Sequence, residues 1–137
     1  MSNSSIRFKS APFLRGYEEF TDLPEGRRIL VYSLQEIATE KTLALADRAR
    51  NETRDLYDLW HLTSHEGIEL GALADAMRQK LEFRGKPFAG IADAIRNKEA
   101  RLKALWSGRL AYQMTTLPEF DEVFRAVQRA LRQADLP

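Results

Sequence analysis

Apolar residues recur three and four positions apart through most of the chain beyond residue 33, which is the spacing of one face of an α-helix. The predicted helices cover about 34–48, 53–64, 69–84, 88–97 with its continuation over 98–106, and a last helix from about 116. The clearest apolar stripe belongs to the last helix, at Phe120, Val123, Phe124, Val127 and Leu131. We therefore expect a mainly α fold, a bundle of about five helices.

Start and stop signals support these helices. The segments "SLQE" (33–36) and "TLPE" (116–119) both have the capping-box pattern, in which a Ser or Thr and a Glu three residues later satisfy the first backbone N–H groups. Thr53 is a cap candidate for the second helix, and Gly67 is placed to end it. The sequence therefore predicts that Ser33 and Thr116 cap the helices that follow them.

The N-terminal part has a different character. The segment "IRFKS" (6–10) gives a weak strand signal, and "RRILVY" (27–32) gives a stronger one. We predict a small β element over residues 1–32 and a helical domain over 33–137. A strand pair alone is marginally stable in water, so this β element is expected to be the edge of something larger, or to pair with a second copy in a homo-oligomer.

Length and charge narrow the classes of function. The chain has 137 residues, a usual length for one domain, and its net charge is +1, so a site for a polyanion has to be a local patch. It has no cysteine, which excludes disulfides and thiolate chemistry. Without a signal-peptide pattern or a run of about 20 apolar residues, we expect a cytoplasmic protein with no membrane partner.

Lys41 lies beside the apolar stripe of the first predicted helix, four residues after Ile37 and four before Leu45. Two interpretations are open. Its methylene stem can cover apolar surface while the ammonium stays in water. Alternatively, its compact charge points into a cleft and holds a phosphate group.

The segment "TRDLYDLWHL" (53–62) places Asp55 and Asp58 three positions apart, on neighbouring positions of one helix surface. Ordinary helix chemistry accounts for both, since Asp55 falls in the first turn and Asp58 can pair with Arg54. The alternatives are that an aspartate holds a lysine in position, binds a metal or acts as a base.

Taken together, these motifs resemble the AbiEii/AbiGii family of nucleotidyltransferase toxins from abortive-infection systems. The matching elements are a helix with Glu36 and "EK" (40–41), followed by a helix that opens with "RDLYDL" (54–59). The resemblance covers roughly residues 28–132, including "ALW" (104–106) and "LPEFDEVFRAVQRAL" (117–131).

The resemblance implies a polymerase-β-like enzyme that adds nucleotides to the acceptor end of tRNA and is paired with an antitoxin protein. In this family, Lys41 would contact or position the nucleotide phosphates. Asp55 would match the functional aspartate, with Asp58 as its neighbour and Arg54 as a substrate-binding residue.

One family motif has no match. Upstream of residue 28 there is no glycine-rich turn followed by an Asp-x-Asp/Glu pair, and the first acidic residue is Glu18. Paired carboxylates are what hold catalytic Mg²⁺. We therefore expect the chain to correspond to the C-terminal part of the toxin and to be inactive alone, with no metal site of its own. Mg²⁺ and a nucleoside triphosphate would bind only once the missing half is added.

Two other classes of function remain open. Arg54 and His61 have the loose spacing of HEPN ribonucleases, in which histidine and arginine cleave RNA by acid–base chemistry. The chain can also be a non-catalytic helical interaction module. His61 itself is expected on a helix surface. His61 and His65 have a metal-ligand spacing, but no third ligand accompanies them.

The stretch 95–113 is rich in basic residues and contains Trp106. It predicts an RNA-contacting face on which Arg101 and Lys103 bind substrate phosphates. The alternative is a solvated helix face, with Lys98 among its charges and Trp106 in the core.

Overall fold

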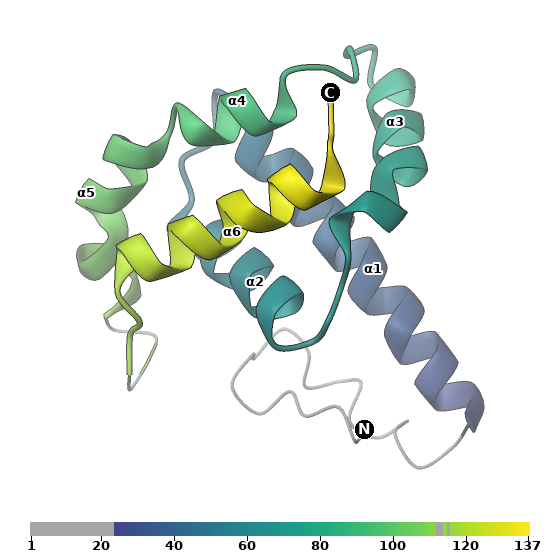
Figure 1. Cartoon of the computed structure of the whole chain (residues 1–137), viewed down its shortest axis with the longest axis horizontal. Helices are drawn as coiled ribbons and strands as arrows, with labels where there is room; N and C mark the ends of the chain where they lie inside the picture. The colour runs from purple at the N-terminus through teal and green to yellow at the C-terminus, as the bar shows by residue number, and fades with distance from the viewer. Residues whose placement is uncertain (1–23, 112–113, 115) are drawn as a thin grey trace. The chain divides into compact units, whose positions relative to one another are not determined.

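The computed structural model describes residues 24–111, 114 and 116–137 (Figure 1). The chain divides into two compact units, residues 1–37 and 38–137. Among the described residues, no helix is long and apolar enough to cross a membrane.

Within the described ranges the chain forms six α-helices and one 3-10 helix, which confirms the mainly α fold. They are α1 (Pro24–Ala46), α2 (Thr53–Ser64), η2 (Leu70–Leu73), α3 (Ala74–Phe83), α4 (Ile91–Arg96), α5 (Glu99–Leu110) and α6 (Phe120–Ala134). The predicted strand at 6–10 lies outside the described residues, and the domain boundary predicted between 32 and 33 stays a prediction.

The strand predicted over 27–32 is wrong, because these residues belong to α1, which already begins at Pro24. Proline suits the first helical position, since its missing N–H would have no partner there. The β-branched and aromatic run at 29–32 is compatible with a helix that continues on both sides. Ser33 therefore lies inside α1, and "SLQE" is not a capping box.

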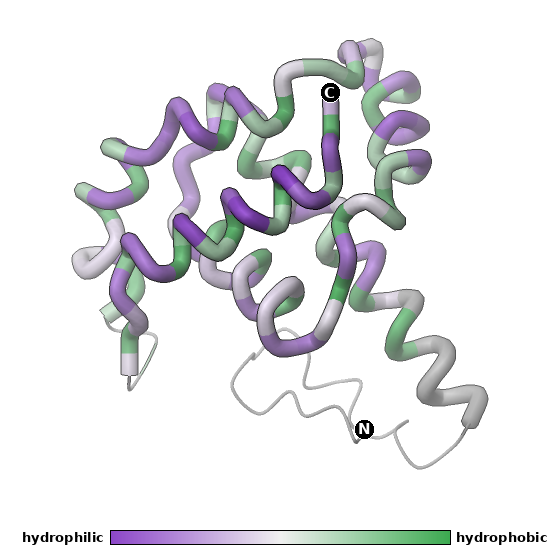
Figure 2. Tube along the Cα trace, in the orientation of Figure 1, coloured by the Kyte–Doolittle hydropathy of each residue, from purple (hydrophilic) through white to green (hydrophobic). Residues whose placement is uncertain are grey.

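In the unit 38–137 the core forms around α6, which packs against α2, η2, α4 and α5. The predicted stripe from Phe120 to Leu131 is buried, as expected. Hydrophobic and hydrophilic positions alternate along α6 in Figure 2. Leu102 and Trp106 of α5 and Leu56 and Leu59 of α2 are also buried. Burial of this continuous apolar stripe fixes α6 as the central helix of this unit.

Helix ends differ from prediction at two places. The carboxylate of Glu52, not the Thr53 side chain, caps α2 by accepting from the Arg54 N–H at 3.2 Å. Helix α6 begins at Phe120, so "TLPE" is not its capping box. The Pro118 carbonyl instead accepts the indole N–H of Trp106 at 2.9 Å. Gly67 follows α2, as predicted, with a positive φ of 72° that favours glycine.

Candidate functional site

Lys41 lies between the two aspartates singled out in the sequence. Its Nζ is 3.1 Å from Oδ1 of Asp55 and 3.0 Å from Oδ2 of Asp58. The two carboxylates are buried, with 1% and 2% of their side chains exposed, while 24% of the Lys41 side chain is exposed. One lysine thus bridges two buried carboxylates and keeps a route to solvent.

The local fold explains this geometry. Lys41 lies five residues before the end of α1, a short connection over 47–52 follows, and α2 then begins at Thr53. A spacing of three on α2 turns Asp55 and Asp58 toward the same side. That shared side was predictable from sequence, but the contact with a lysine 14 positions away depends on how α1 and α2 meet.

Two arginines complete the cluster. Arg50 Nε donates to Asp55 Oδ2 at 2.6 Å, and Arg54 Nε donates to Asp58 Oδ1 at 2.9 Å. The hydrogen bond from Arg50 to Asp55 is the main cause that raises the pKa of Arg50. Sequence analysis predicted the Arg54–Asp58 pair but missed Arg50, whose only signal was its position in the connection before the "RD" motif.

The aspartates fit a role as anchors for cations better than a role as metal ligands. All four of their carboxylate oxygens face a cation: Lys41 and Arg50 at Asp55, and Lys41 and Arg54 at Asp58. Three positive and two negative side chains give this cluster a surplus of positive charge. Within residues 24–111, 114 and 116–137, no group of three His, Cys, Asp or Glu residues could hold a metal ion. Because their oxygens already face cations, Asp55 and Asp58 do not fit a Mg²⁺ site.

A cleft of about 800 Å³ opens beside Lys41. Five cationic and three acidic side chains line it, a net charge of +2. They are Lys41, Arg48, Arg50, Arg84 and Lys86, with Glu40, Asp47 and Asp55. Such a cleft attracts anions, because an excess of positively charged side chains in a concave surface makes the local electrostatic potential positive.

One wall of the cleft contains Glu40. Arg84 Nη2 donates to both carboxylate oxygens of Glu40 at 3.1 Å, and Lys80 Nζ lies 3.0 Å from Oε2. Partial burial would raise the pKa of Glu40, but the hydrogen bonds from Lys80 and Arg84 outweigh it and the pKa is lowered. These pairs connect α1 to the end of α3.

The basic stretch on α4 and α5 does not reach this cleft. Arg101 is exposed, and the exposed Lys103 lies 3.2 Å from Asp121 of α6. Lys98 is not on a solvated face at all, because only 7% of it is exposed. Trp106 is buried, which confirms its expected place in the core.

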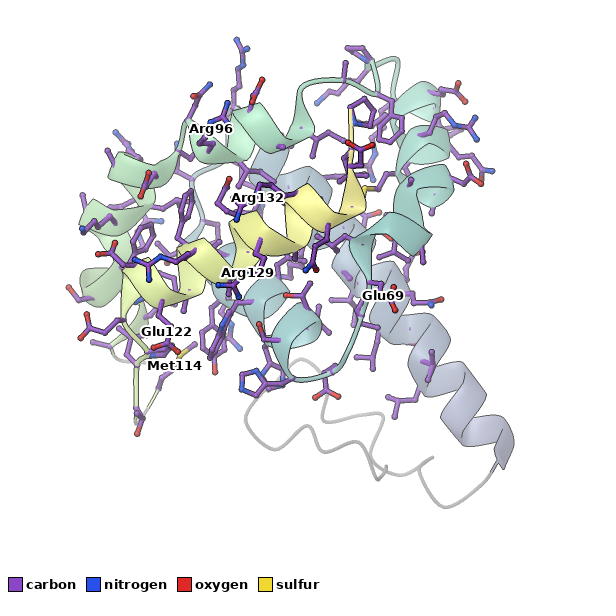
Figure 3. The ribbon with its side chains drawn as sticks, viewed as in Figure 1. Glu69, Arg96, Met114, Glu122, Arg129 and Arg132 are labelled. Atoms are coloured by element: carbon purple, nitrogen blue, oxygen red, sulfur yellow. The ribbon has the colours of Figure 1, made fainter. Side chains whose placement is uncertain are left out.

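A second hollow of about 500 Å³ lies between α4, α5 and α6. Lys103 lines it, together with Arg96 and Arg132, which are labelled in Figure 3. The sequence prediction grouped Arg96 and Lys103 with Arg101, which does not line the hollow, and did not include Arg132. The spacing of Arg125, Gln128 and Arg132 on α6 was the signal for this second polar face.

The expectation of a surface His61 is wrong. The residue is 6% exposed, its Nε2 lies 3.2 Å from Oε2 of Glu66, and its ring stacks on His65 at 5.0 Å between centroids. Burial, and to a smaller extent the neighbouring His65, lower the pKa of His61 to about 4. Burial also raises the pKa of Glu66.

The unit 38–137 thus combines a helical scaffold with a basic cleft that is lined by a lysine held between two buried aspartates. The sequence model of one family, described as nucleotidyl transferase AbiEii toxin of a type IV toxin–antitoxin system, matches residues 10–130. Because the match covers most of the chain, the protein belongs to this family. No curated protein and no solved structure matches the chain.

Proposed function

We propose that the cleft beside Lys41 binds the triphosphate of a nucleotide and that the chain supplies this part of a nucleotidyltransferase toxin site. The observation that carries the proposal is the Lys41 ammonium, placed 3.1 and 3.0 Å from two buried carboxylates at the edge of a cleft with net charge +2. Nucleotidyl transfer needs little covalent chemistry from the protein. Positioning and neutralisation of phosphate charge supply most of the rate.

In this proposal each side chain has a distinct task. Lys41 contacts the phosphates and shares their developing negative charge. Asp55 and Asp58 are positioning residues that orient the Lys41 ammonium. This is the alternative, left open by the sequence, in which an aspartate holds a lysine in position. Arg50 offers a second cation, since 52% of its side chain is exposed, and Arg54 holds Asp58 in place.

We further propose that this chain does not transfer nucleotides alone. The oxygens of Asp55 and Asp58 are already engaged by cations, and the Asp-x-Asp/Glu motif of the family has no match before residue 28. The carboxylates for Mg²⁺ would then come from a separate polypeptide segment. Once bound there, Mg²⁺ would neutralise charge on the nucleotide.

The partners are proposals as well. An antitoxin protein is expected because the family belongs to toxin–antitoxin systems. tRNA is the proposed acceptor, with the exposed Arg101 and Lys103 as phosphate contacts on α5. The predicted self-association through the N-terminal edge involves residues 1–32, of which 1–23 lie outside the described ranges and 27–32 are helical, and it stays a prediction.

Calorimetry with inorganic tripolyphosphate tests the anion site directly. We expect binding by the wild type and roughly 10- to 100-fold weaker binding by Lys41→Met, the size of a lost hydrogen bond to a charged group. Arg78→Met is the matched control, because Arg78 also pairs with two acids, Asp75 and Glu82, but does not line the cleft. Equal affinity of Lys41→Met and wild type would contradict the site.

A second assay separates the enzymatic alternatives. The chain is incubated with a tRNA pool, labelled nucleoside triphosphates and Mg²⁺, and the RNA is resolved on a gel. We expect no label and no lengthening. Labelled RNA that is lost with Lys41→Met would show that the chain is a complete transferase. Shortened RNA that is lost with His61→Ala would support the HEPN-like ribonuclease, which gains no support from a histidine that is 6% exposed.

The interaction module has its own outcome. If tripolyphosphate does not bind and no RNA is modified, the helical unit is left with a non-catalytic role. Suppose that a partner protein binds the wild type and Lys41→Met, but not variants with substitutions on the exposed face of α5. That result would then support an interaction module.

A further inference from the structure

Lys98 is a buried lysine outside the residues assigned to the cleft. It precedes α5, as the N-cap residue, and only 7% of it is exposed. A lysine is seldom buried unless hydrogen bonds satisfy its ammonium, because loss of hydration is costly. Burial is the main cause that lowers the pKa of Lys98.

The Lys98 ammonium is satisfied by the chain that connects α1 to α2. Its Nζ donates to the backbone carbonyls of Asp47 and Arg50, which lie 51 and 48 positions away in the sequence. The Asp47 carbonyl also accepts the Arg50 backbone N–H at 3.1 Å. Lys98 thus reaches from the α4–α5 junction and binds both ends of the 47–50 turn.

Arg50, the last residue of that turn, begins a continuous series of contacts that leads to the cleft. Arg50 donates through Nε to Asp55 Oδ2 at 2.6 Å and through Nη2 to Oδ1 at 3.4 Å. The same Oδ1 accepts from Lys41 at 3.1 Å. A shift of the Arg50 backbone would therefore displace the Arg50 side chain, which pairs with Asp55 alongside Lys41.

We propose that Lys98 is a positioning residue of the anion site: by holding the carbonyls of Asp47 and Arg50, it keeps Arg50 on Asp55 and thereby fixes Lys41 at the cleft. The relevance of this role to ligand binding rests on the proposed function. The contact chain itself does not, since it exists without a ligand. Lys98 touches no anion in this arrangement and acts only through the turn.

The test follows the Arg50 side chain and the ligand separately. NMR of protein labelled with ¹⁵N-arginine reports the Nε–H signal of Arg50, assigned by its loss in Arg50→Lys. In the wild type we expect a shifted, slowly exchanging signal, because this N–H donates to a buried carboxylate. In Lys98→Met, which removes the donors but keeps the stem length, we expect that signal to move to the position of solvent-exposed arginines.

Affinity for tripolyphosphate is measured on the same samples. We expect roughly tenfold or more weaker binding by Lys98→Met, a size typical of losing a residue that orients a binding group. Arg78→Met should change neither the Arg50 signal nor the affinity. Where Lys98→Met does not fold, Lys98→Gln replaces it, because its amide keeps donors on a stem too short to reach both carbonyls.

The outcomes separate the two proposals. An unchanged Arg50 signal in a folded Lys98 variant overturns the positioning role, whatever the affinity. A changed signal with unchanged affinity overturns its connection to the anion site. If the wild type binds no tripolyphosphate while the Arg50 signal still depends on Lys98, the positioning of Arg50 is supported and the proposed function fails.

Discussion

Asp58 and Arg54 form an ion pair one helical turn apart on α2, with 2.9 Å between Oδ1 and Nε, and 2% of the Asp58 side chain is exposed. The other oxygen of Asp58 lies 3.0 Å from Lys41. A buried carboxylate with two cationic partners differs from a surface i,i+4 pair. Its removal leaves charges without compensation in a place that water reaches poorly.

Asp58→Asn is therefore expected to destabilise the fold by about 2–3 kcal/mol, below the range for fully buried pairs because both cations are partly exposed. Urea denaturation followed by circular dichroism measures this change. Asp75→Asn is the control, since Asp75 pairs with Arg78 but its side chain is 85% exposed. The control should change stability by less than about 0.5 kcal/mol, and equal effects of the two variants would contradict the prediction.

The Glu40–Arg84 pair should contribute little to stability. Each side chain is 42% exposed, so solvent screens the attraction. A double-mutant cycle with Glu40→Gln and Arg84→Met is expected to give a coupling energy below about 1 kcal/mol. A coupling above about 2 kcal/mol would mean that water is excluded from this wall of the cleft.

Acid should destabilise the protein partly through His61. Its pKa is lowered from 6.5 to about 4, so between these values the unfolded chain binds a proton that the folded chain does not. Stability from this residue is complete above pH 6.5 and falls by about 3 kcal/mol as the pH falls to 4. The raised pKa of Glu66 acts in the opposite direction and reduces the net change.

In His61→Gln the difference in stability between pH 6.5 and pH 4 should therefore shrink. Urea denaturation at a series of pH values measures it, and His65→Gln should cause a smaller change, because the exposed His65 makes only the minor contribution to the lowered pKa of His61. An unchanged pH profile in His61→Gln would show that this histidine is protonated in the folded state.

Thr53→Val is expected to leave stability unchanged or raise it by up to about 1 kcal/mol. The Thr53 hydroxyl is buried and has no hydrogen-bond partner among the described residues, so its burial has a cost that valine avoids. Thermal unfolding measures the effect. A loss above about 1 kcal/mol would mean that the hydroxyl has a partner, such as a water molecule.

The sequence predicted the parts of the site that depend on local spacing. Asp55 and Asp58 share a side of α2 because they are three residues apart, and the Arg54–Asp58 pair follows from a spacing of four. The contacts that Lys41, Arg50 and Lys98 make could not be predicted in this way. Each depends on the tertiary arrangement of the connection between α1 and α2.

The errors have physical causes too. His61 was expected at the surface because a helix normally has a polar face, but α2 is buried on most of its sides, including Asp55, Asp58 and His61. The run at 29–32 was interpreted as a strand because β-branched and aromatic residues favour strands, yet such preferences are weak and their context overrides them. Pro24, which suits the first position of a helix, was a better indication of the structure of this segment than the strand preference of residues 29–32.

The shared position of Lys41 has a consequence for the divergence of related sequences. Because one ammonium lies on one oxygen of each buried carboxylate, loss of the lysine alone leaves each aspartate with one arginine as its cationic partner, Arg50 at Asp55 and Arg54 at Asp58, whereas loss of one aspartate adds to the surplus of positive charge. Positions 41, 55 and 58 should therefore change together or not at all, and a homologue with a neutral residue at 41 is expected to carry a compensating neutral residue at 55 or 58.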